Sequence, residues 1–368
     1  MDFPFGASQP TSQIEVKMKA LRLMTWKSEA ELVEVPKPTP GPGQVVIKIG
    51  GAGACHSDLH LMHDFVDGQH SSIGWQPPFT LGHENAGWID SIGAGVSRFR
   101  EGDPVAVYGA WGCGECGKCK AGFETYCDNP ANSVIPGGGG GLGLDGGMAE
   151  YMLVPSERLL LDLPEGLKPI DAAPLTDAAL TPYHAIRRSW TKLTPDAFIV
   201  IIGIGGLGHM AVQIAKATTA ATIIAIDSKT EALELATSLG AKYTFKVGDE
   251  IQSKVKDLTG GHGAEVVLDF VGSEQTMALG ASLCRVLGDF TIVGIAGGVL
   301  PFSFFSIPYE TSLQTTYWGS RVELAEVLDL AAHHLITPKI SKFNLEDAPQ
   351  VYLDLAAGKI EGRAVIVP

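Results

Sequence analysis

The segment FIVIIGIGGLGHMAVQIAKATTAATIIAID, residues 198–227, decides the fold. We expect an apolar strand over 198–202, a glycine-rich turn, a helix over 210–218 and a strand over 222–226. The same alternation continues along the chain, with a helix near 230–239, a strand at 265–270, a helix near 274–286 and a strand at 290–294. Strands that alternate with helices predict an α/β fold with a parallel, doubly wound Rossmann sheet.

The turn Gly203-Ile204-Gly205-Gly206-Leu207-Gly208 matches the dinucleotide pattern GxGxxG. Such matches are common in a chain with 45 glycines, but here a strand precedes the turn and a helix follows it. Gly203 would allow the tight turn, Gly205 the approach of a pyrophosphate, and Gly208 the close packing of helix on strand. The pyrophosphate would face the helix N-terminus. The alternative is a purely structural turn of an α/β unit.

Asp227 ends the second strand, 24 residues after Gly203. A carboxylate at this position accepts hydrogen bonds from the adenosine ribose and repels a 2′-phosphate. The sequence therefore predicts NAD rather than NADP.

Residues 19–160 are rich in short β-like runs, at 44–49, 104–108 and 149–154, with Pro/Gly turns at 41–44 and 136–141. The stretch 322–368 carries one helical segment and ends in a strand at 364–367. We therefore expect residues 1–179 and 321–368 to form a β-rich catalytic domain, and residues 180–320 a dinucleotide-binding domain. Residues 1–17, polar and turn-rich, are expected to be an extension ahead of the first strand.

Four cysteines lie within 15 residues, as Cys113-x2-Cys116-x2-Cys119-x7-Cys127. Four thiolates at this spacing close tetrahedrally on one zinc and leave no position for substrate, so the site would be structural. Iron–sulfur ligation is the alternative, but it needs an electron-transfer role that nothing else in the sequence supports. Uncoordinated cysteines are a further alternative.

A second metal set is predicted from three separate segments. Cys55 lies in Ala-Cys-His-Ser-Asp (54–58) and His83 in Gly-His-Glu (82–84). A catalytic zinc needs three protein ligands and one open position. Asp177, just before the dinucleotide segment, is the candidate third ligand, with a helix N-cap as its alternative role.

The formal net charge is −14, which disfavours nucleic acid and anionic membrane surfaces as partners. No run of about 18 apolar residues is present, and we see no secretory signal. Clustered thiols without such a signal favour a reducing compartment, so a cytoplasmic location is expected.

From Met18 to Pro368 these motifs, in this order, resemble the zinc-containing medium-chain alcohol dehydrogenases. The resemblance is strongest to bacterial NAD-dependent secondary-alcohol dehydrogenases, at Pro-Leu-Thr-Asp (174–177) and Tyr-Trp-Gly (317–319). It implies a GroES-like catalytic domain beside the Rossmann domain, with Cys55, His83 and Asp177 on the catalytic zinc. Many animal and yeast members have cysteine where this chain has Asp177, so the carboxylate is a departure.

The resemblance also implies roles for residues around the cofactor. Ser57 would take the alcohol proton, His60 would form the far end of a proton relay, and Glu84 would lie behind the zinc ligands. Thr181 would lie near the nicotinamide, while His56 and Arg363 would reach the cofactor phosphates. Trp75, Leu142, Tyr317 and Trp318 would line the substrate pocket. A merely polar His60, and aromatics that serve as core or subunit contacts, remain the alternatives.

The expected activity is reversible hydride transfer between an apolar, secondary alcohol and NAD, giving a ketone or aldehyde, with two Zn²⁺ per chain. A polyol or sugar dehydrogenase of the same superfamily is the alternative. A non-catalytic, NAD-binding redox sensor would have incomplete ligands, and a zinc-free quinone reductase would need neither the cysteine cluster nor Cys55. The short segment between Cys127 and Met148 points by resemblance to a homotetramer, with a dimer as the alternative.

The Asp227→Gly variant tests the cofactor prediction. Loss of the carboxylate removes the charge that repels a 2′-phosphate, so the preference for NAD over NADP should weaken. The ratio of kcat/KM with the two cofactors measures this effect. An unmutated protein that prefers NADP would contradict the assignment.

Overall fold

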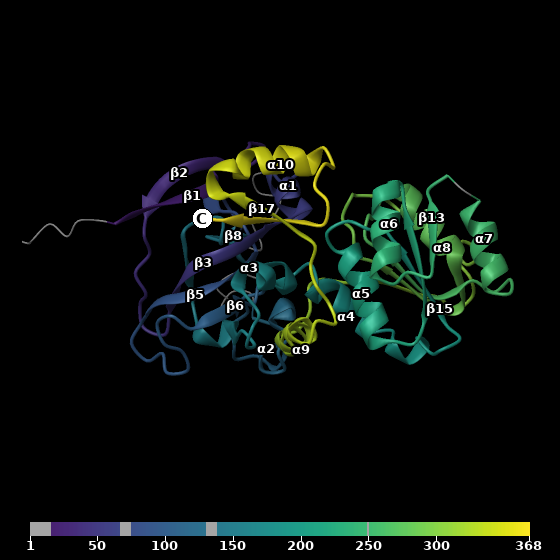
Figure 1. Cartoon of the computed structure of the whole chain (residues 1–368), viewed down its shortest axis with the longest axis horizontal. Coiled ribbons are helices and arrows are strands. Elements are labelled where there is room, and N and C mark those ends of the chain that lie inside the picture. The colour runs from purple at the N-terminus through teal and green to yellow at the C-terminus, as the bar shows by residue number, and fades with distance from the viewer. Residues whose placement is uncertain (1–15, 67–74, 130–137, 249) are drawn as a thin grey trace, which may run out of the picture.

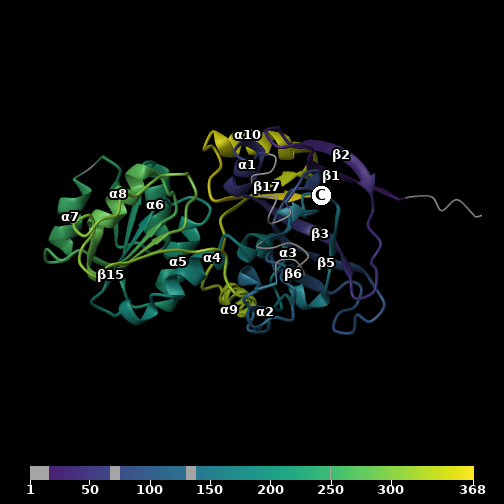
Figure 2. The same ribbon diagram turned by 180° about the vertical axis from the view of Figure 1, so that it is seen from behind.

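The computed structural model describes residues 16–66, 75–129, 138–248 and 250–368. It has two lobes (Figures 1 and 2). One is rich in β-strands and also carries helices, and the other is a sheet flanked by helices. Residues 1–15 lie outside the described residues, so the expected extension over 1–17 is nearly all outside them. Residues 136 and 137 of the predicted glycine loop also lie outside.

One lobe contains a six-stranded sheet in which all neighbouring strands are parallel. The strand order is β13-β12-β11-β14-β15-β16, the order of a dinucleotide-binding sheet. The fold-class prediction is therefore confirmed. The strands are β11 (Phe198–Ile202), β12 (Thr222–Asp227), β13 (Tyr243–Lys246), β14 (Ala264–Asp269), β15 (Cys284–Ile292) and β16 (Ser312–Thr315).

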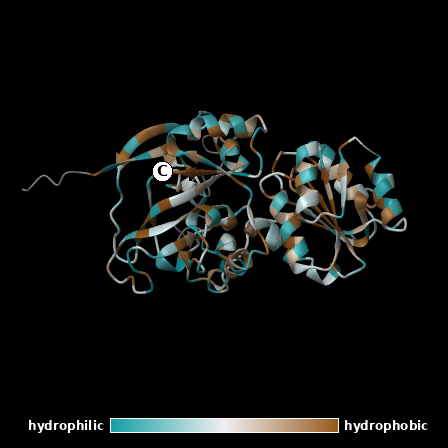
Figure 3. Ribbon diagram, viewed as in Figure 1, coloured by the Kyte–Doolittle hydropathy of each residue, from teal (hydrophilic) through white to brown (hydrophobic). Residues whose placement is uncertain are grey.

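The central strands of this sheet are buried on both faces, which explains their continuous apolar sequences. In Figure 3 the hydrophobic residues of this lobe are concentrated in the strands between the helices. The helices are α5 (Gly208–Thr218), α6 (Thr230–Leu239), α7 (Ile251–Leu258) and α8 (Glu274–Leu283).

The other lobe is built on a seven-stranded sheet with the path β10-β6-β5-β3-β18-β17, in which β9 also pairs with β3. Distant parts of the chain meet here, because β18 pairs antiparallel with β3 and parallel with β17. The strands are β3 (Val45–Ala54), β5 (Glu84–Ile92), β6 (Pro104–Val107), β9 (Tyr151–Val154), β10 (Leu160–Asp162), β17 (Ile340–Asn344) and β18 (Arg363–Val367).

Smaller elements complete this lobe. A three-stranded sheet has the order β2-β1-β4, and β7 pairs with β8. These strands are β1 (Lys17–Leu23), β2 (Glu31–Pro36), β4 (Phe79–Thr80), β7 (Gly139–Gly140) and β8 (Gly143–Leu144). The helices outside the Rossmann sheet are α1 (His56–His63), α2 (Gly117–Lys120), α3 (Pro169–Ala172), α4 (Leu180–Arg187), α9 (Arg321–Ala332) and α10 (Ala348–Ala356). Short 3-10 turns are η2 (Glu124–Tyr126), η3 (Glu157–Leu159), η4 (Ala173–Thr176), η5 (Trp190–Lys192) and η6 (Leu345–Asp347).

Three sequence expectations need correction. The stretch 322–368 holds two helices, α9 and α10, with β17 between them, rather than one helical segment. The helix expected near 274–286 ends at Leu283, because the chain pairs with β14 from Cys284 onward. The elements β13, α7 and β16 were not predicted. The strands β13 and β16 are short and lie at the two edges of the sheet, where the residues are partly exposed and the sequence has no continuous apolar run.

Helix α5 joins the two parts of the molecule through polar side chains one turn apart. The side chain of Gln213 donates to the Thr337 carbonyl at 3.0 Å and accepts from the Thr337 amide at 2.9 Å. His209 Nε2 accepts from the Lys339 amide at 3.2 Å, while Nδ1 lies 3.0 Å from the Gly205 carbonyl. His209 is thus a neutral imidazole that ties the glycine turn to the segment leading into β17.

This arrangement makes the stability of the protein depend on pH. Burial lowers the pKa of His209 to about 4 from a usual value of 6.5. Between these values the unfolded chain binds a proton that the folded protein does not, so stability falls as pH falls. From pH 7 to pH 5 this group should remove about 2 kcal/mol of unfolding free energy. Urea titrations of the protein and of His209→Gln measure it; an equal pH dependence in both would contradict the prediction.

Candidate active site

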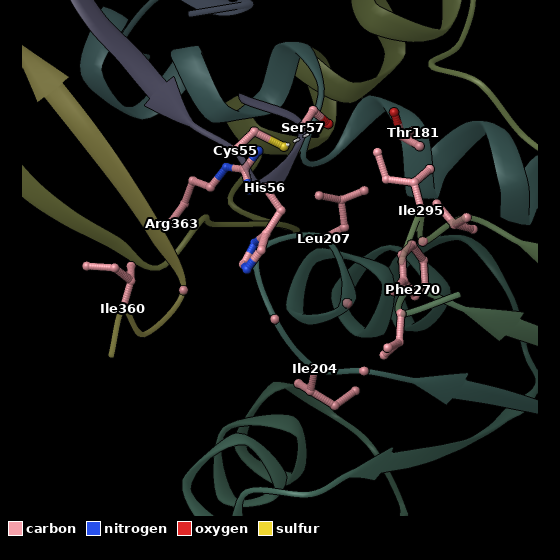
Figure 4. Close-up of a pocket in the computed structure, with 18 of the residues that line it drawn as sticks. Cys55, His56, Ser57, Thr181, Ile204, Leu207, Phe270, Ile295, Ile360 and Arg363 are labelled. Atoms are coloured by element: carbon pink, nitrogen blue, oxygen red, sulfur yellow. Dashed lines mark hydrogen bonds between the residues drawn. The ribbon is translucent and has the colours of Figure 1, made fainter. Parts of the chain in front are cut away.

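One cleft of about 710 Å³ lies between the two lobes, and residues from both line it. In Figure 4, Cys55, Ser57 and Arg363 lie on one side, and Ile204 and Phe270 lie across from them. The glycine turn, the predicted zinc ligands and the segment 316–318 all face this space. The fold therefore brings together sequence motifs that are far apart in the chain.

The glycine turn has the geometry that its three glycines predict. Gly203 has a φ of +87°, in the left-handed region that glycine adopts freely. No atom lies within 4 Å of a Cβ built at Gly205, so its outer face is open to a ligand. A Cβ at Gly208 would overlap the Gly203 carbonyl, so only glycine lets α5 begin here.

Asp227 holds this turn in place from the end of β12. Its carboxylate accepts from the Ile204 amide at 2.7 Å and from the Lys229 amide at 2.9 Å. A carboxylate has about four acceptor positions, so two backbone bonds leave room for ribose hydroxyls. Asp227 also lines the cleft, as its predicted role requires.

The predicted ligand atoms of Cys55, His83 and Asp177, together with a carboxylate oxygen of Glu84, lie within 4.8 Å of one another. All four residues are buried. Cys55 is the N-cap of α1, His83 directly precedes β5, and Asp177 follows η4. His83 Nε2 lies 3.6 Å from an Asp177 oxygen, so the two donors face the same point.

Asp58, fully buried on α1, orients this donor set. One oxygen lies 3.2 Å from His83 Nδ1. The other accepts from the Cys55 amide at 3.0 Å and from the Tyr352 hydroxyl of α10 at 2.7 Å. With Nδ1 oriented by a carboxylate, Nε2 is the ring nitrogen that would coordinate a metal.

The residues fit a zinc ion. Burial alone would lower the pKa of His83, but Asp58 and Asp177 raise it well above its usual value. Although burial opposes it, hydrogen bonding to His83 and Thr181 lowers the pKa of Asp177. The site therefore stabilises positive charge at the point where the three donors converge. One thiolate, one imidazole and one carboxylate are a donor set of the kind that catalytic zinc uses.

The Glu84 carboxylate forms a buried ion pair with Arg363. The Arg363 guanidinium donates to both carboxylate oxygens, with Nε 2.8 Å from one of them. A Cβ at Gly53 would overlap this carboxylate, so glycine in β3 makes room for the pair. Arg363 Nη1 also lies against Gly206 of the glycine turn.

The residues predicted to handle the proton and the cofactor lie around the same space. Ser57 Oγ lies 3.5 Å from Cys55 Sγ, and Thr181 donates to Asp177 at 2.6 Å. His60, one turn after Ser57 on α1, pairs through Nδ1 with the Asp64 carboxylate. His56, also on α1, lines the cleft with these three residues.

The four cysteines form a second cluster, with all sulfur atoms within 4.8 Å of one another. Cys113 Sγ and Cys119 Sγ are 3.9 Å apart, close to the roughly 3.8 Å between thiolates on one tetrahedral zinc. Hydrogen bonds from the Cys116 and Glu115 amides lower the pKa of Cys113 to about 6. The pKa of Cys116 is lowered as well, while burial raises the pKa values of Cys119 and Cys127.

Three of the four predicted substrate residues, Leu142, Tyr317 and Trp318, line the cleft. Trp75 does not line it in the part of the chain that the structure describes. Its ring instead stacks on Phe65, with centroids 6.0 Å apart and planes 8° apart. The place on the cleft wall that the resemblance implies for Trp75 is therefore not seen among the described residues.

Asp58 and Tyr352 are site residues to which sequence reasoning gave no role. Asp58 had a usable signal, since an acid three residues after Cys55 matches the N3 position of a capped helix. Tyr352 had none, because 294 residues separate it from Asp58.

The Asp58→Asn variant should bind metal at the Cys55 set about 10–100-fold more weakly. An amide offers one acceptor oxygen to three groups that now donate to a carboxylate. Competition with a chelator measures the affinity, and Tyr352→Phe, which keeps the carboxylate, serves as the milder control. Unchanged affinity in Asp58→Asn would show that His83 needs no such orientation.

Two family models match the chain. The model for the alcohol dehydrogenase GroES-like domain matches residues 41–165, and the model for zinc-binding dehydrogenases matches residues 206–333. The chain is 38% identical over 354 residues to an NAD-dependent alcohol dehydrogenase of Sulfolobus acidocaldarius, covering 95% of the chain and 99% of the relative. It is 35% identical over 357 residues to a D-arabinose 1-dehydrogenase (NADP(+)) of Saccharolobus solfataricus, covering 96% and 98%.

The solved structure of the alcohol dehydrogenase from Aeropyrum pernix superposes with a TM-score of 0.86 at 36% identity. The match covers 95% of this chain and all of that one. Both halves of the chain thus match the family that the sequence motifs indicated. The chain belongs to the zinc-containing medium-chain alcohol dehydrogenase family.

Proposed function

We propose that this enzyme transfers hydride between an apolar, preferably secondary alcohol and NAD, reversibly giving the ketone or aldehyde. The observation that carries the proposal is that one cleft is lined both by the Cys55, His83 and Asp177 donors and by the glycine turn. A substrate oxygen at the donors and a nicotinamide held over the turn would then lie in the same cleft.

Zinc supplies Lewis acidity that lowers the pKa of a hydroxyl group, and NAD supplies the hydride acceptor. The chain itself positions these groups and moves the proton. We assign Ser57 as the acceptor of the hydroxyl proton, because its Oγ lies beside Cys55 Sγ at the inner end of the cleft. Thr181 bonds Asp177 and lies on the cleft wall, where the nicotinamide would contact it.

His60 is proposed as the outer end of the proton path. Its side chain is 28% exposed, so it borders both the cleft and solvent. Its Nδ1 pairs with the Asp64 carboxylate, which fixes the orientation of the ring on α1. Ser57 and His60 lie one helical turn apart on α1. A cofactor hydroxyl group between their side chains would pass the proton from Ser57 to His60.

The cofactor is proposed to be NAD, held by the glycine turn, by Asp227 at the ribose and by His56 and Arg363 near the phosphates. Asp227 already stabilises the turn through the Ile204 amide, so its charge is fixed in position. A 2′-phosphate would meet this fixed negative charge.

Two zinc ions per chain are proposed, one structural at the four cysteines and one catalytic at Cys55, His83 and Asp177. The support is that each donor set has its ligand atoms within 4.8 Å of one another. Elemental analysis of the protein should give two zincs, and Cys116→Ser should retain one. A count near one zinc per chain in the unaltered protein would show that one of the two proposed sites does not bind zinc.

The substrate wall is proposed to select apolar alcohols. Leu142, Ile295 and Trp318 present carbon surface to the cleft, and Tyr317 lies next to them. The sugar-dehydrogenase alternative is favoured by the relative that acts on D-arabinose, and Thr316 adds a hydroxyl to the lining. A polyol would leave most of its hydroxyls against carbon, at about 1–3 kcal/mol for each unpaired group.

The test is a panel of alcohols assayed with NAD and NADP. 2-Octanol and 1-phenylethanol should exceed ethanol in kcat/KM, by up to about fourfold for each additional buried methylene. Sorbitol and D-arabinose should be poor substrates. If either of these two exceeds the secondary alcohols, the sugar-dehydrogenase alternative is correct.

Self-association is proposed as well, as a homotetramer with a dimer as the alternative. The support is an exposed apolar surface beside β16, where Phe304 and Phe305 are 75% and 82% exposed and Val299 is 71% exposed. Monomeric proteins rarely expose such patches. Sedimentation equilibrium measures the state of assembly.

We further propose that residues 1–179 with 321–368 form the catalytic domain and residues 180–320 the dinucleotide-binding domain. The six strands of the Rossmann sheet, within 198–315, support this division. The cluster of reduced cysteines supports a reducing, cytoplasmic location. No helix in the described part of the chain has the length and hydrophobicity to cross a membrane.

A further inference from the structure

The four-cysteine loop, residues 113–127, is the thiolate lobe, and it packs against residues 317–321, the return segment. The Arg321 amide donates to the Gly122 carbonyl at 2.9 Å, and the Arg321 guanidinium lies 3.4 Å from the Glu124 carboxylate. The Tyr126 hydroxyl donates to the Tyr317 carbonyl at 3.4 Å. The thiolate lobe is therefore bonded to both ends of the return segment, although the two are about 190–200 residues apart in sequence.

The centre of this contact is the Gly319 carbonyl. The Tyr108 hydroxyl, at the start of the loop that leads into the thiolate lobe, donates to it at 2.6 Å. Thr125 Oγ1, on η2 of the lobe, lies 3.3 Å from the same oxygen and 3.0 Å from the Tyr108 hydroxyl. Both side chains are buried, so water does not compete for these hydrogen bonds.

Trp318, the residue before Gly319, has an unusual backbone. Its φ is +52°, in the left-handed region that bulky residues seldom adopt. Such conformations persist only where the surroundings hold them, and they concentrate at functional sites. Here the two residues that follow Trp318 are held by hydrogen bonds. The Gly319 carbonyl accepts from Tyr108, and the Ser320 amide donates to Glu323 at 2.7 Å.

The left-handed backbone places the Trp318 ring on the inner wall of the cleft. The ring is 3% exposed and meets His83 edge to face, with centroids 6.0 Å apart. A Cβ at Gly109 would overlap the indole, so the residue after Tyr108 must be glycine for the ring to fit. Tyr108 and Gly109 thus fix Trp318 from two directions, one through the backbone and one through the ring.

We propose that Tyr108 and Thr125 are positioning residues for substrate selection, which hold Trp318 against His83 and make the thiolate lobe part of the substrate wall. The inference rests on the proposed function, since it concerns which alcohols the cleft accepts. A change in the lobe would reach the substrate through the Gly319 carbonyl. The lobe then has a second role beside that of a metal-stabilised loop.

The test uses Tyr108→Phe and Thr125→Val, which remove the hydroxyl groups and keep the bulk. The ratio of kcat/KM for 1-phenylethanol to that for 2-propanol should fall about tenfold, because a phenyl group replaces one methyl group and must be accepted by the wall that Trp318 forms. Tyr183→Phe is the matched control, since the Tyr183 hydroxyl donates to Glu326 on α9 rather than to the Gly319 carbonyl. This control should keep the ratio within about twofold.

A readout without substrate follows the ring itself. The chain has six tryptophans, so protein labelled with 5-fluorotryptophan gives six fluorine signals, and Trp318→Phe identifies the one from Trp318. This signal should shift in Tyr108→Phe, Thr125→Val and Cys116→Ser, and stay in place in Tyr183→Phe. Thermal unfolding of each variant separates a loss of stability from a change at the wall.

An unchanged ratio together with an unmoved Trp318 signal overturns the proposal, whatever happens to the melting temperature. A signal that moves in Tyr108→Phe but not in Cys116→Ser overturns the part that concerns the thiolate lobe. If the unaltered protein oxidises no alcohol at all, the proposed function fails, and the fluorine signals still decide whether Tyr108 and Thr125 hold Trp318.

Discussion

The buried ion pair between Arg363 and Glu84 is the interaction on which the geometry of the cleft depends. The two side chains are 3% and 0% exposed, and the guanidinium binds both carboxylate oxygens. Removing one partner of such a pair typically costs about 3–5 kcal/mol, because it leaves a buried charge unpaired. Glu84 follows His83 directly, and Arg363 lies against Gly206. The pair therefore connects the segment that carries His83 to the glycine turn of the other lobe.

The charges around this pair depend on one another. Asp58, Asp177 and Glu84 are all buried near Cys55, and Arg363 is the buried cation beside them. A zinc ion would supply further positive charge to this group of acidic residues. The Asp58 carboxylate accepts hydrogen bonds from the Cys55 amide and the Tyr352 hydroxyl and pairs with His83. Orientation of the ligands and charge balance thus come from the same hydrogen bonds.

Much of this arrangement could be predicted from the sequence, because its signals are local. The glycine turn, its flanking strand and helix, and the spacing of the four cysteines each lie within about 30 residues. The fold class followed from the alternation of strands and helices. Contacts between distant segments left no such signal, as Tyr352 on Asp58 and Tyr108 on Gly319 illustrate. Trp75 was assigned to the substrate wall by resemblance, but it is not among the described residues that line the cleft, and its ring stacks on Phe65.

The seven-stranded sheet contains a constraint on the order of assembly during synthesis. Strand β18 pairs with β3 and is made about 300 residues after it. At roughly 5–20 residues per second, the early strands must wait about 15–60 seconds for their partner. The Rossmann strands between them, β11 to β16, are complete before β18 emerges. The nascent chain can therefore complete its Rossmann sheet while the seven-stranded sheet still lacks the strand β18 beside β3.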